Sequence, residues 1–262
     1  MTPTASVATG SLLVSLLDPK PGDARGFHRW YERDHFYSGC MLGPRFFAGR
    51  RYVATRDHRA LRYPDLSPVV PNMRAGSCLA LYWIEAGHHD EAESWAVERV
   101  NALNAADRMH PREQVHAGFY DRDWSWERDA DGVPIELALD HPSPGLLFLC
   151  VDRNEGVTAT QLAQWYTETF FASLSKDSSV ACCLAATPRP LPDDAPAYVR
   201  RVAGLEQRTL LVFFCEADPV EVWQRDFMGH SEAVNASGLG AVSFASPFVP
   251  TIPGTDAYCA DL

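Results

Sequence analysis

One predicted helix near the N-terminus carries the residues best suited to proton transfer. Phe27, Trp30, Tyr31, Asp34 and His35 fall at positions i, i+3, i+4, i+7 and i+8, which lie on one face of a helix. We therefore expect His35 to point inward. An imidazole titrates near neutral pH and can act as general acid or base, and the Tyr31 phenol could donate a hydrogen bond to a developing oxyanion.

Three more polar side chains could extend this catalytic site. His28 precedes His35 by two helical turns and lies on roughly the same side of the helix. On the following strand, Arg50 and Arg51 must point to opposite faces, so one of them faces a packed layer. That guanidinium could hold a carboxylate or phenolate, and we assign Arg51 to catalysis and Arg50 to substrate binding. A purely structural role remains the alternative for each of these residues.

Further candidates for substrate binding come from other strands and from a helix near the C-terminus. His116 and Tyr120 share one face of a predicted strand, and that face could line the same pocket. Trp83, with other aromatic residues of the first half, adds flat apolar surface suited to an aromatic ligand, and Tyr52 on the second strand is a further predicted binding residue. His230 interrupts an apolar helical stripe. Packing or a surface position explains each of them as well.

Several kinds of site are absent from the sequence. The chain has no phosphate-binding glycine loop, GxSxG, HExxH or CxxC motif, and its histidines lack the spacing of a metal site. We therefore predict no metal and no cofactor. Haem stays open, because a single histidine ligand leaves little trace in a sequence.

An internal repeat shows which elements must position these residues. The run Leu12–Asp18 matches Leu146–Asp152, and in both copies a Trp-Tyr pair follows about thirteen residues later, at 30–31 and 165–166. In this alignment Phe170 takes the position of His35. A core position that accepts a phenyl ring in one copy therefore carries an ionisable imidazole in the other.

Each copy reads as strand, helix, strand, long loop, strand, helix, strand, which is the ferredoxin-like βαββαβ order. The predicted strands are 11–17, 46–55, 77–85 and 114–121 in the first copy and 145–151, 179–187, 208–216 and 240–246 in the second. The helices are 25–39, 90–108, 158–175 and 219–236. The long loops 56–76 and 188–207 should cover or line a site. We predict an α+β fold with a first module at 1–122, a linker at 123–144 and a second module at 145–262.

Strands such as Leu79–Ile84 and Leu210–Cys215 are apolar on both faces, which indicates sheets buried on both sides. The two sheets are therefore expected to pack together as one barrel with the helices outside.

Composition limits the partners. A formal net charge of -11 gives no basic surface for nucleic acid or anionic lipid. The apolar run at 12–17 is too short for a signal peptide or a membrane span, and the seven cysteines look like small core residues. We expect a cytoplasmic protein that binds neither nucleic acid nor membrane. The chain could also pair as a homodimer.

The segment Phe27-His-Arg-Trp-Tyr-Glu-Arg-Asp-His35, with Arg50-Arg-Tyr52, resembles the EthD-like branch of the dimeric α/β-barrel superfamily, fused in tandem over nearly the whole chain. The resemblance implies two ferredoxin-like modules that form a single-chain dimeric α/β barrel. Members of the superfamily include cofactor-free monooxygenases, cyclases, dehydratases, decarboxylases and haem-binding proteins. They often place a His on the first helix or a strand, with a Tyr nearby, and His35, His28 and Tyr31 match the helix position.

The leading hypothesis is a cofactor-independent lyase that acts on a small phenolic or polyketide-like aromatic molecule. Decarboxylation, dehydration, cyclisation and retro-aldol release of an aldehyde all fit a His35 base or acid assisted by Tyr31 and an arginine. One alternative is a cofactor-free monooxygenase, which needs the same base. Another is a non-catalytic binder of aromatic metabolites.

Overall fold

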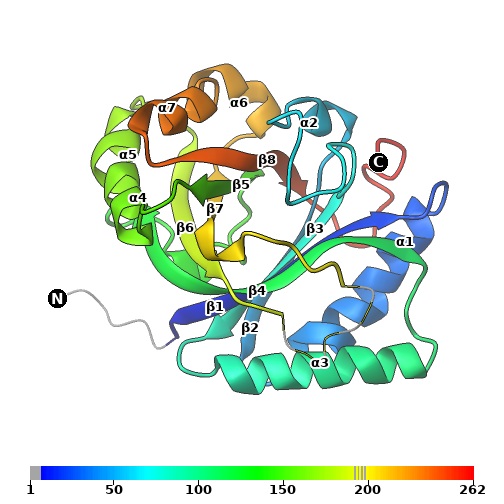
Figure 1. Cartoon of the computed structure of the whole chain (residues 1–262). Coiled ribbons are helices and arrows are strands. Elements are labelled where there is room, and N and C mark those ends of the chain that lie inside the picture. Colours follow the sequence, from blue (N-terminus) through cyan, green and yellow to red (C-terminus); the bar gives the residue numbers. More distant parts are fainter. Residues whose placement is uncertain (1–6, 192, 194, 196, 198) are drawn as a thin grey trace.

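The computed structural model describes residues 7–191, 193, 195, 197 and 199–262. Its eight antiparallel strands close into a barrel in the order β1-β3-β2-β8-β5-β7-β6-β4 (Figure 1). The strands of the first module are β1 (Thr9–Pro19), β2 (Phe46–Val53), β3 (Cys78–Glu85) and β4 (Arg112–Glu127). Those of the second are β5 (Gly145–Arg153), β6 (Val180–Pro188), β7 (Arg208–Cys215) and β8 (Gly240–Pro250).

The helices lie outside the barrel (Figure 1). The first module has α1 (Ala24–Trp30), which continues into two π-helical turns, η1 (Tyr31–His35) and η2 (Tyr37–Met41), and then α2 (Arg56–Ala60) and α3 (His89–Ala105). The second has α4 (Ala159–Trp165), the π-helical turn η4 (Tyr166–Phe170), α5 (Phe171–Ser173), α6 (Pro219–Asp226) and α7 (His230–Ser237). Short 3-10 turns are η3 (Ile135–Leu137) and η5 (Leu205–Gln207).

Side chains alternate between two layers along each strand, as the period of a β-strand requires. On β1, Leu12, Val14 and Leu16 face the barrel interior, and Leu17 packs outward against the helices of the first module. A separate helix–sheet core covers the second module. The predicted α+β fold, with two ferredoxin-like modules in one closed barrel, is therefore confirmed.

Among the differences from the predicted elements, one concerns a strand and one a helix. Strand β4 continues to Glu127, beyond its predicted end at residue 121, because its second half pairs with β6 and joins the modules. The helix predicted at 219–236 is two helices, because Gly229 adopts a φ of 85° between them, a conformation that favours glycine.

Each long loop crosses to the other module. Leu61 and Tyr63, which precede β3, pack against the helix–sheet core of the second module. Leu191 and Val199, which precede β7, lie beside the helix–sheet layer of the first module. In Figure 1 this second loop crosses in front of β4 toward α3.

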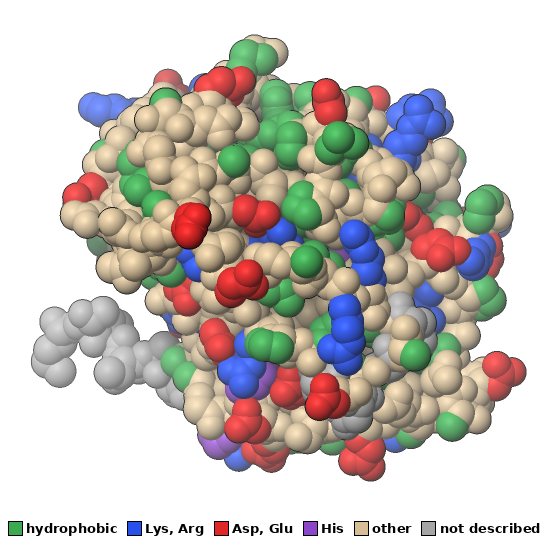
Figure 2. Space-filling view, in the orientation of Figure 1, with side chains coloured by type: hydrophobic (Ala, Val, Ile, Leu, Met, Phe, Trp, Pro, Cys, Tyr) green, Lys and Arg blue, Asp and Glu red, His purple; other side chains and the backbone are tan. Residues whose placement is uncertain are grey.

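On the face shown in Figure 2, acidic and basic side chains are interspersed. Among the residues that the structure describes, no helix combines the length and apolar character that crossing a membrane requires.

Candidate functional site

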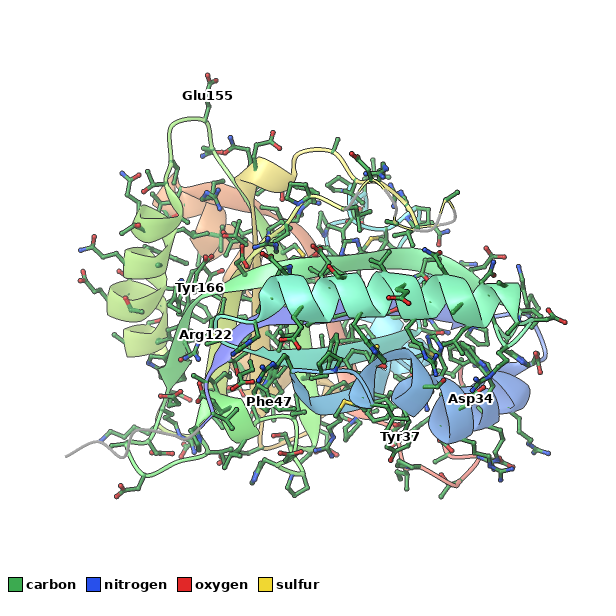
Figure 3. The ribbon with its side chains drawn as sticks, turned by 90° about the horizontal axis from the view of Figure 1, so that it is seen from below. Asp34, Tyr37, Phe47, Arg122, Glu155 and Tyr166 are labelled. Carbon is green, nitrogen blue, oxygen red and sulfur yellow. The ribbon has the colours of Figure 1, made fainter. Side chains whose placement is uncertain are left out.

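A cavity of about 110 Å³ lies in the first module, between the outer face of its sheet and the helices above it. The α1–η1–η2 helix and α3 run side by side over this sheet (Figure 3). The cavity wall is mostly apolar, and the cover comes from Leu191, Ala195 and Val199 of the second module. Its polar lining residues are Ser15, Tyr31, His35, Cys40, Tyr82, Arg112 and Gln114.

His35 lines this cavity with a buried side chain. Its ring stacks on Trp30, with centroids 4.5 Å apart and planes 18° from parallel. The Nδ1 atom is buried and has no hydrogen-bond partner among the described residues. Burial, and then the charge of Arg112, lower the pKa of His35 to about 3. The imidazole is therefore neutral at physiological pH and can exchange a proton or hydrogen bond with a ligand.

The π-helical turn η1 sets the direction of His35. A π-turn inserts extra residues into the helical spacing, and such turns are frequent at functional sites. Asp34, predicted on the inward face, instead lies at the helix flank (Figure 3), where it accepts a hydrogen bond of 2.8 Å from Ser38 Oγ and pairs with Arg108. Gly39 leaves room for the imidazole, because a Cβ at that position would lie 2.9 Å from His35 Cε1.

Tyr31 belongs to a buried row of weak acids. Its hydroxyl lies 3.1 Å from the hydroxyl of Tyr82, which in turn interacts with Cys40. Burial raises the pKa of both Tyr31 and Cys40 to about 12, so these groups are neutral donors at physiological pH. Helical spacing predicted Tyr31, whereas Cys40 was expected only as a small core residue and no role was predicted for the Tyr82 hydroxyl.

Two residues on β4 complete the polar lining. The Arg112 guanidinium lies over the Trp30 ring, 5.4 Å from its centroid. Gln114 Nε2 is 3.5 Å from Ser15 Oγ and 3.2 Å from the His116 carbonyl oxygen. Sequence reasoning missed both Arg112 and Gln114.

His28 and Arg51 lie together behind Tyr31 and do not line the cavity. Arg51 Nη2 is 2.7 Å from His28 Nδ1, and the guanidinium lies 4.4 Å from the centroid of the Tyr31 ring. Burial, followed by the charge of Arg51, lowers the pKa of His28 to about 4. The pair therefore packs against Tyr31, which lines the cavity, and does not reach the cavity itself.

The structure does not bring His116 and Tyr120 to the cavity beside His35, which the sequence predicted them to share. His116 Nε2 lies 2.6 Å from the Tyr120 hydroxyl, and both side chains face the barrel interior, whereas the cavity lies on the outer face of β4. Burial lowers the pKa of His116 to about 4. Strand alternation indicates which residues share a face, but it does not indicate which face becomes the interior.

Three other predicted binding residues also lie away from the cavity. Tyr52 and Trp83 belong to the barrel core, and Trp83 Nε1 donates to the Ile135 carbonyl oxygen at 3.0 Å. Arg50 donates to the carbonyl oxygens of Leu139, at 3.3 Å, and His141. The inward side chains of β2 and β3 therefore contact the linker between the modules. Arg50 and Trp83 hold it through hydrogen bonds to its backbone.

His230 lies in the helix–sheet layer of the second module. Its Nε2 atom is 3.0 Å from the Tyr166 hydroxyl, and its ring stacks on Phe170 with centroids 4.3 Å apart. Burial lowers its pKa to about 3. His230 is therefore separated from the His35 cavity by the barrel.

Strand register gives a position-by-position comparison of the two modules. Leu13 pairs with Tyr82 as Leu147 pairs with Phe213, and Leu17 pairs with Gln114 as Val151 pairs with Val242. The polar cavity residues Ser15, His35, Tyr82, Arg112 and Gln114 correspond in this way to Leu149, Phe170, Phe213, Gly240 and Val242. The polar residues that line the cavity thus belong to the first module. In the second module, Tyr63 packs beside Trp223.

No family model matches the chain, and no curated protein matches it in sequence. Many solved structures resemble it in fold, and three of them serve as examples. One, provisionally described as the chlorite dismutase TA0507, is 11% identical with a TM-score of 0.55, covering 97% of this chain and 100% of its own. One from Fusobacterium nucleatum subsp. nucleatum, provisionally described as a monooxygenase, is 10% identical with a TM-score of 0.53 and 94% coverage of both chains.

The third structure, an anthrone oxidase-like protein, is 11% identical with a TM-score of 0.51, covering 94% of this chain and 92% of its own. These proteins belong to the dimeric α/β-barrel, ferredoxin-like superfamily. At such identities the similarity shows the fold alone. Fold is shared by many unrelated functions, so the reaction must be argued from the site.

The described residues do not fit a haem beside His35. The cavity of about 110 Å³ is smaller than the roughly 300 to 1,000 Å³ of pockets that hold drug-sized ligands, and a haem is larger than most of those. Within the described part of the chain, no group of three or more His, Cys, Asp or Glu side chains is arranged to hold a metal ion.

Proposed function

We propose that the cavity beside His35 binds a small phenolic or enolisable aromatic molecule, and that His35 moves a proton to or from it without a cofactor. The observation that carries this proposal is the buried imidazole with an unpaired Nδ1 beside a cavity. Leaving a buried polar atom unpaired costs about 1 to 3 kcal/mol, and Phe170 at the equivalent position avoids that cost. A ligand that forms a hydrogen bond with Nδ1 would offset that cost.

The low pKa of His35 limits the proton transfers in which its imidazole can act as a base. A base with a pKa of about 3 is weak while the cavity is empty, because an imidazolium would be buried near Arg112. When the departing proton leaves an anion in the cavity, that anion stabilises the imidazolium and lies near Arg112 as well. The site therefore favours proton abstraction that creates a phenolate or enolate within the cavity.

Oxygenation is the reaction that we favour. An enolate formed at a CH₂ group adds O₂ to give a peroxide, which takes up the proton held by His35 and then loses water. The balance is R₂CH₂ + O₂ → R₂C=O + H₂O, so the substrate itself supplies all the electrons. Tyr31 and Tyr82 would donate hydrogen bonds to the developing oxyanion.

A lyase would use the same proton transfer, and decarboxylation or aldehyde release would then replace the oxygen step. Two similarly folded proteins with TM-scores above 0.5 are described as a monooxygenase and as anthrone oxidase-like, which favours oxygenation over the lyase. The EthD-like resemblance of the segment 27–35, and a tandem duplication of one module, are part of this proposal.

The test follows exchange of the benzylic protons of phenylpyruvate and of 2-indanone in D₂O by proton NMR, and oxygen uptake in parallel. His35→Phe should lower exchange by about 100-fold or more, within the range typical of general acid–base catalysis. His230→Phe is the matched control, since it also removes a buried imidazole with an unpaired Nδ1 but one outside the cavity. It should retain exchange within about twofold of wild type.

The two measurements separate the hypotheses. Exchange that persists in the His35→Phe variant, with its fold confirmed by circular dichroism, would remove His35 from the reaction. Oxygen uptake matched by ketone formation supports the oxygenase. Exchange without oxygen uptake, accompanied by release of CO₂ or an aldehyde, would replace the oxygenase with the lyase.

A further inference from the structure

We infer that the ligand places one aromatic ring where the second module carries the side chain of Phe227, and that Ala96 determines this specificity by leaving the space open. We use the proposed function only in placing the ligand in the same cavity. Proton transfer by His35 specifies neither the size nor the orientation of that ligand.

The helix α3, which covers the cavity, corresponds to α6 and α7 of the second module. Trp83 of β3 and Phe214 of β7 pair with equivalent residues of β1 and β5, so they are counterparts. Ala96 follows Trp83 at the same distance along the chain as Phe227 follows Phe214. Ala96 and Phe227 are therefore counterparts as well. The same alignment matches further buried residues, namely Ala92 with Trp223 and Leu103 with Val234.

In the second module, a phenyl ring packs between the helix and the sheet. The Phe227 side chain is 1% exposed, and its ring centroid lies 6.2 Å from that of Phe213 on β7 and 5.6 Å from that of Trp223. Phe213 also lies 6.2 Å from Phe170, the residue that ends the π-helical turn. The Phe227 ring is thus part of the aromatic packing around that turn.

In the first module, the corresponding space belongs to the cavity. Ala96 lines the cavity, as do Tyr82 and His35, which are the counterparts of Phe213 and Phe170. A methyl group therefore stands where the second module has a phenyl group. A core relaxes only partly around a side chain that is too small for its site, so the difference leaves a hole. One aromatic ring would restore the packing seen in the second module.

The second module also contains a polar ring next to Phe227. The His230 imidazole stacks on Phe170, with centroids 4.3 Å apart, and its Nε2 atom lies 3.0 Å from the Tyr166 hydroxyl. An aromatic ring that carries a hydrogen-bonding group thus fits beside the π-helical turn when its polar atom meets the tyrosine of that turn.

The first module leaves this position open too. In the same alignment Arg99 is the counterpart of His230, but Arg99 donates to the Ser38 carbonyl oxygen at 3.1 Å and does not line the cavity. Tyr31, which corresponds to Tyr166, does line it. We therefore expect the aromatic ring of the ligand beside Ala96, with its hydroxyl or carbonyl group directed toward Tyr31 and His35.

The volume of the cavity agrees with one ring. An apolar cavity of roughly 150 Å³ in another protein accommodates benzene, whereas drug-sized ligands occupy pockets of about 300 Å³ or more. The present cavity, at about 110 Å³, is of the first kind. A second ring attached to the first would require the cover formed by Leu191 and Val199 to move.

The experiment compares a phenol with one ring, 4-fluorophenol, and a phenol with two, 4′-fluorobiphenyl-4-ol, by fluorine NMR titration without turnover. Wild type should bind 4-fluorophenol about tenfold or more tightly than the biphenyl, although the biphenyl has more apolar surface to bury. Ala96→Phe should weaken the binding of 4-fluorophenol by about 10- to 100-fold, the range that corresponds to burial of one phenyl ring. Ala96→Leu fills less of the space and should cause a smaller loss.

Ala102→Phe is the matched control, because Ala102 is exposed on the same helix and the added phenyl group lies outside the cavity. It should leave the binding of 4-fluorophenol within about twofold of wild type. Circular dichroism and thermal denaturation check that each variant is folded. Ala96→Phe should unfold at or above the wild-type temperature, because filling a cavity usually stabilises a protein.

Three results would overturn the inference. They are unchanged binding of 4-fluorophenol in a folded Ala96→Phe or Ala96→Leu variant, an equal loss in the Ala96→Phe and Ala102→Phe variants, and tighter binding of the biphenyl than of 4-fluorophenol by wild type. If Ala96→Phe does not fold, Ala96→Leu carries the test.

These outcomes are distinguishable from those of the proposed function. Binding of 4-fluorophenol that depends on Ala96, in a protein that does not exchange the protons of phenylpyruvate, would support the ring position and refute the enzyme. Exchange that continues at the wild-type rate in a folded Ala96→Phe variant would overturn the ring position and retain His35 as the base.

Discussion

At the residue scale, the main feature of the protein is a set of buried, neutral histidines. His28, His35, His116 and His230 are each nearly inaccessible to solvent. Burial is the largest cause of the lowered pKa of every one of them, with values of about 3 to 4. His35 differs from the others because it alone in this group lines the described cavity.

These histidines predict a pH dependence of stability. Their pKa lies near 6.5 in the unfolded chain and at about 3 to 4 in the folded protein, so the unfolded state binds more protons between these values. The free energy of unfolding should therefore fall as the pH is lowered from 6.5 to 4. The slope is about 1.4 kcal/mol per pH unit for each such histidine.

The measurement is urea denaturation at several pH values in this window. His230→Phe should flatten the dependence by about 1 to 3 kcal/mol between pH 6.5 and 4, whatever it does to stability at pH 7. The carboxylates with lowered pKa values, such as Asp34 and Asp226, lose their contribution at lower pH and affect this window less. An identical slope in wild type and variant would contradict the assignment.

At the scale of the element, the π-helical turn is shared by both modules, but its last residue differs between them. It occurs at Tyr31–His35 in the first module and at Tyr166–Phe170 in the second. Because both modules keep the turn and its first tyrosine, the turn serves packing in each. The residue that ends the turn, His35 or Phe170, determines whether the packed position can exchange a proton.

Gly39 allows a test of this element. An exposed Gly→Ala change in a helix interior usually stabilises a protein by about 0.5 to 1 kcal/mol. Gly39→Ala should instead destabilise by about 1 to 3 kcal/mol, because the new Cβ would lie 2.9 Å from His35 Cε1 and 3.0 Å from Nδ1. Thermal or urea denaturation measures the change.

A double variant shows whether the His35 imidazole causes the cost of Gly39→Ala. In a His35→Ala background the ring is gone, so Gly39→Ala should become neutral or stabilising. A cost that persists without the imidazole would mean that another neighbour, and not His35, requires the glycine.

At the scale of the whole molecule, the barrel closes through two unequal seams. Strands β4 and β6 pair from Tyr120 to Glu127, whereas the pairing of β2 with β8 is limited to Tyr52 with Pro250 and Val53 with Val249. Local opening requires less free energy where fewer backbone hydrogen bonds must break.

We therefore expect amide hydrogens at the β2–β8 seam to exchange faster than those at the β4–β6 seam, by about tenfold or more. Hydrogen exchange followed by NMR, with Val53 and Trp126 as reporters, measures this difference. Equal protection of the two seams would show that the barrel opens as a single unit.

Much of the fold could be predicted from the sequence, because the same order of apolar strands and helices occurs twice. Strands that are apolar on both faces require cover on both sides, and two echoing modules supply that cover within one chain. His35 and Tyr31 were also predictable, because helical spacing places them on an apolar stripe.

The strand side of the cavity could not be predicted in the same way. A bulge at Val115 changes the register, so Gln114 pairs with Leu17 and His116 with Leu16, on opposite faces of the sheet. Alternation alone would place Gln114 and His116 on one face. Arg112 lies before the predicted start of its strand, and its approach to Trp30 depends on the packing of α1 against β4.

The long loops cross between the two modules of one chain, and this arrangement lets the two modules differ. Leu191 and Val199 of one half roof the cavity of the other, while Leu61 and Tyr63 lie against the opposite helix–sheet core. In an assembly of two identical subunits, any change in such a loop would alter both sites together. A continuous polypeptide removes that constraint, so the described residues of one half can include close packing by Tyr63 and Phe170, while the other half keeps the cavity beside His35.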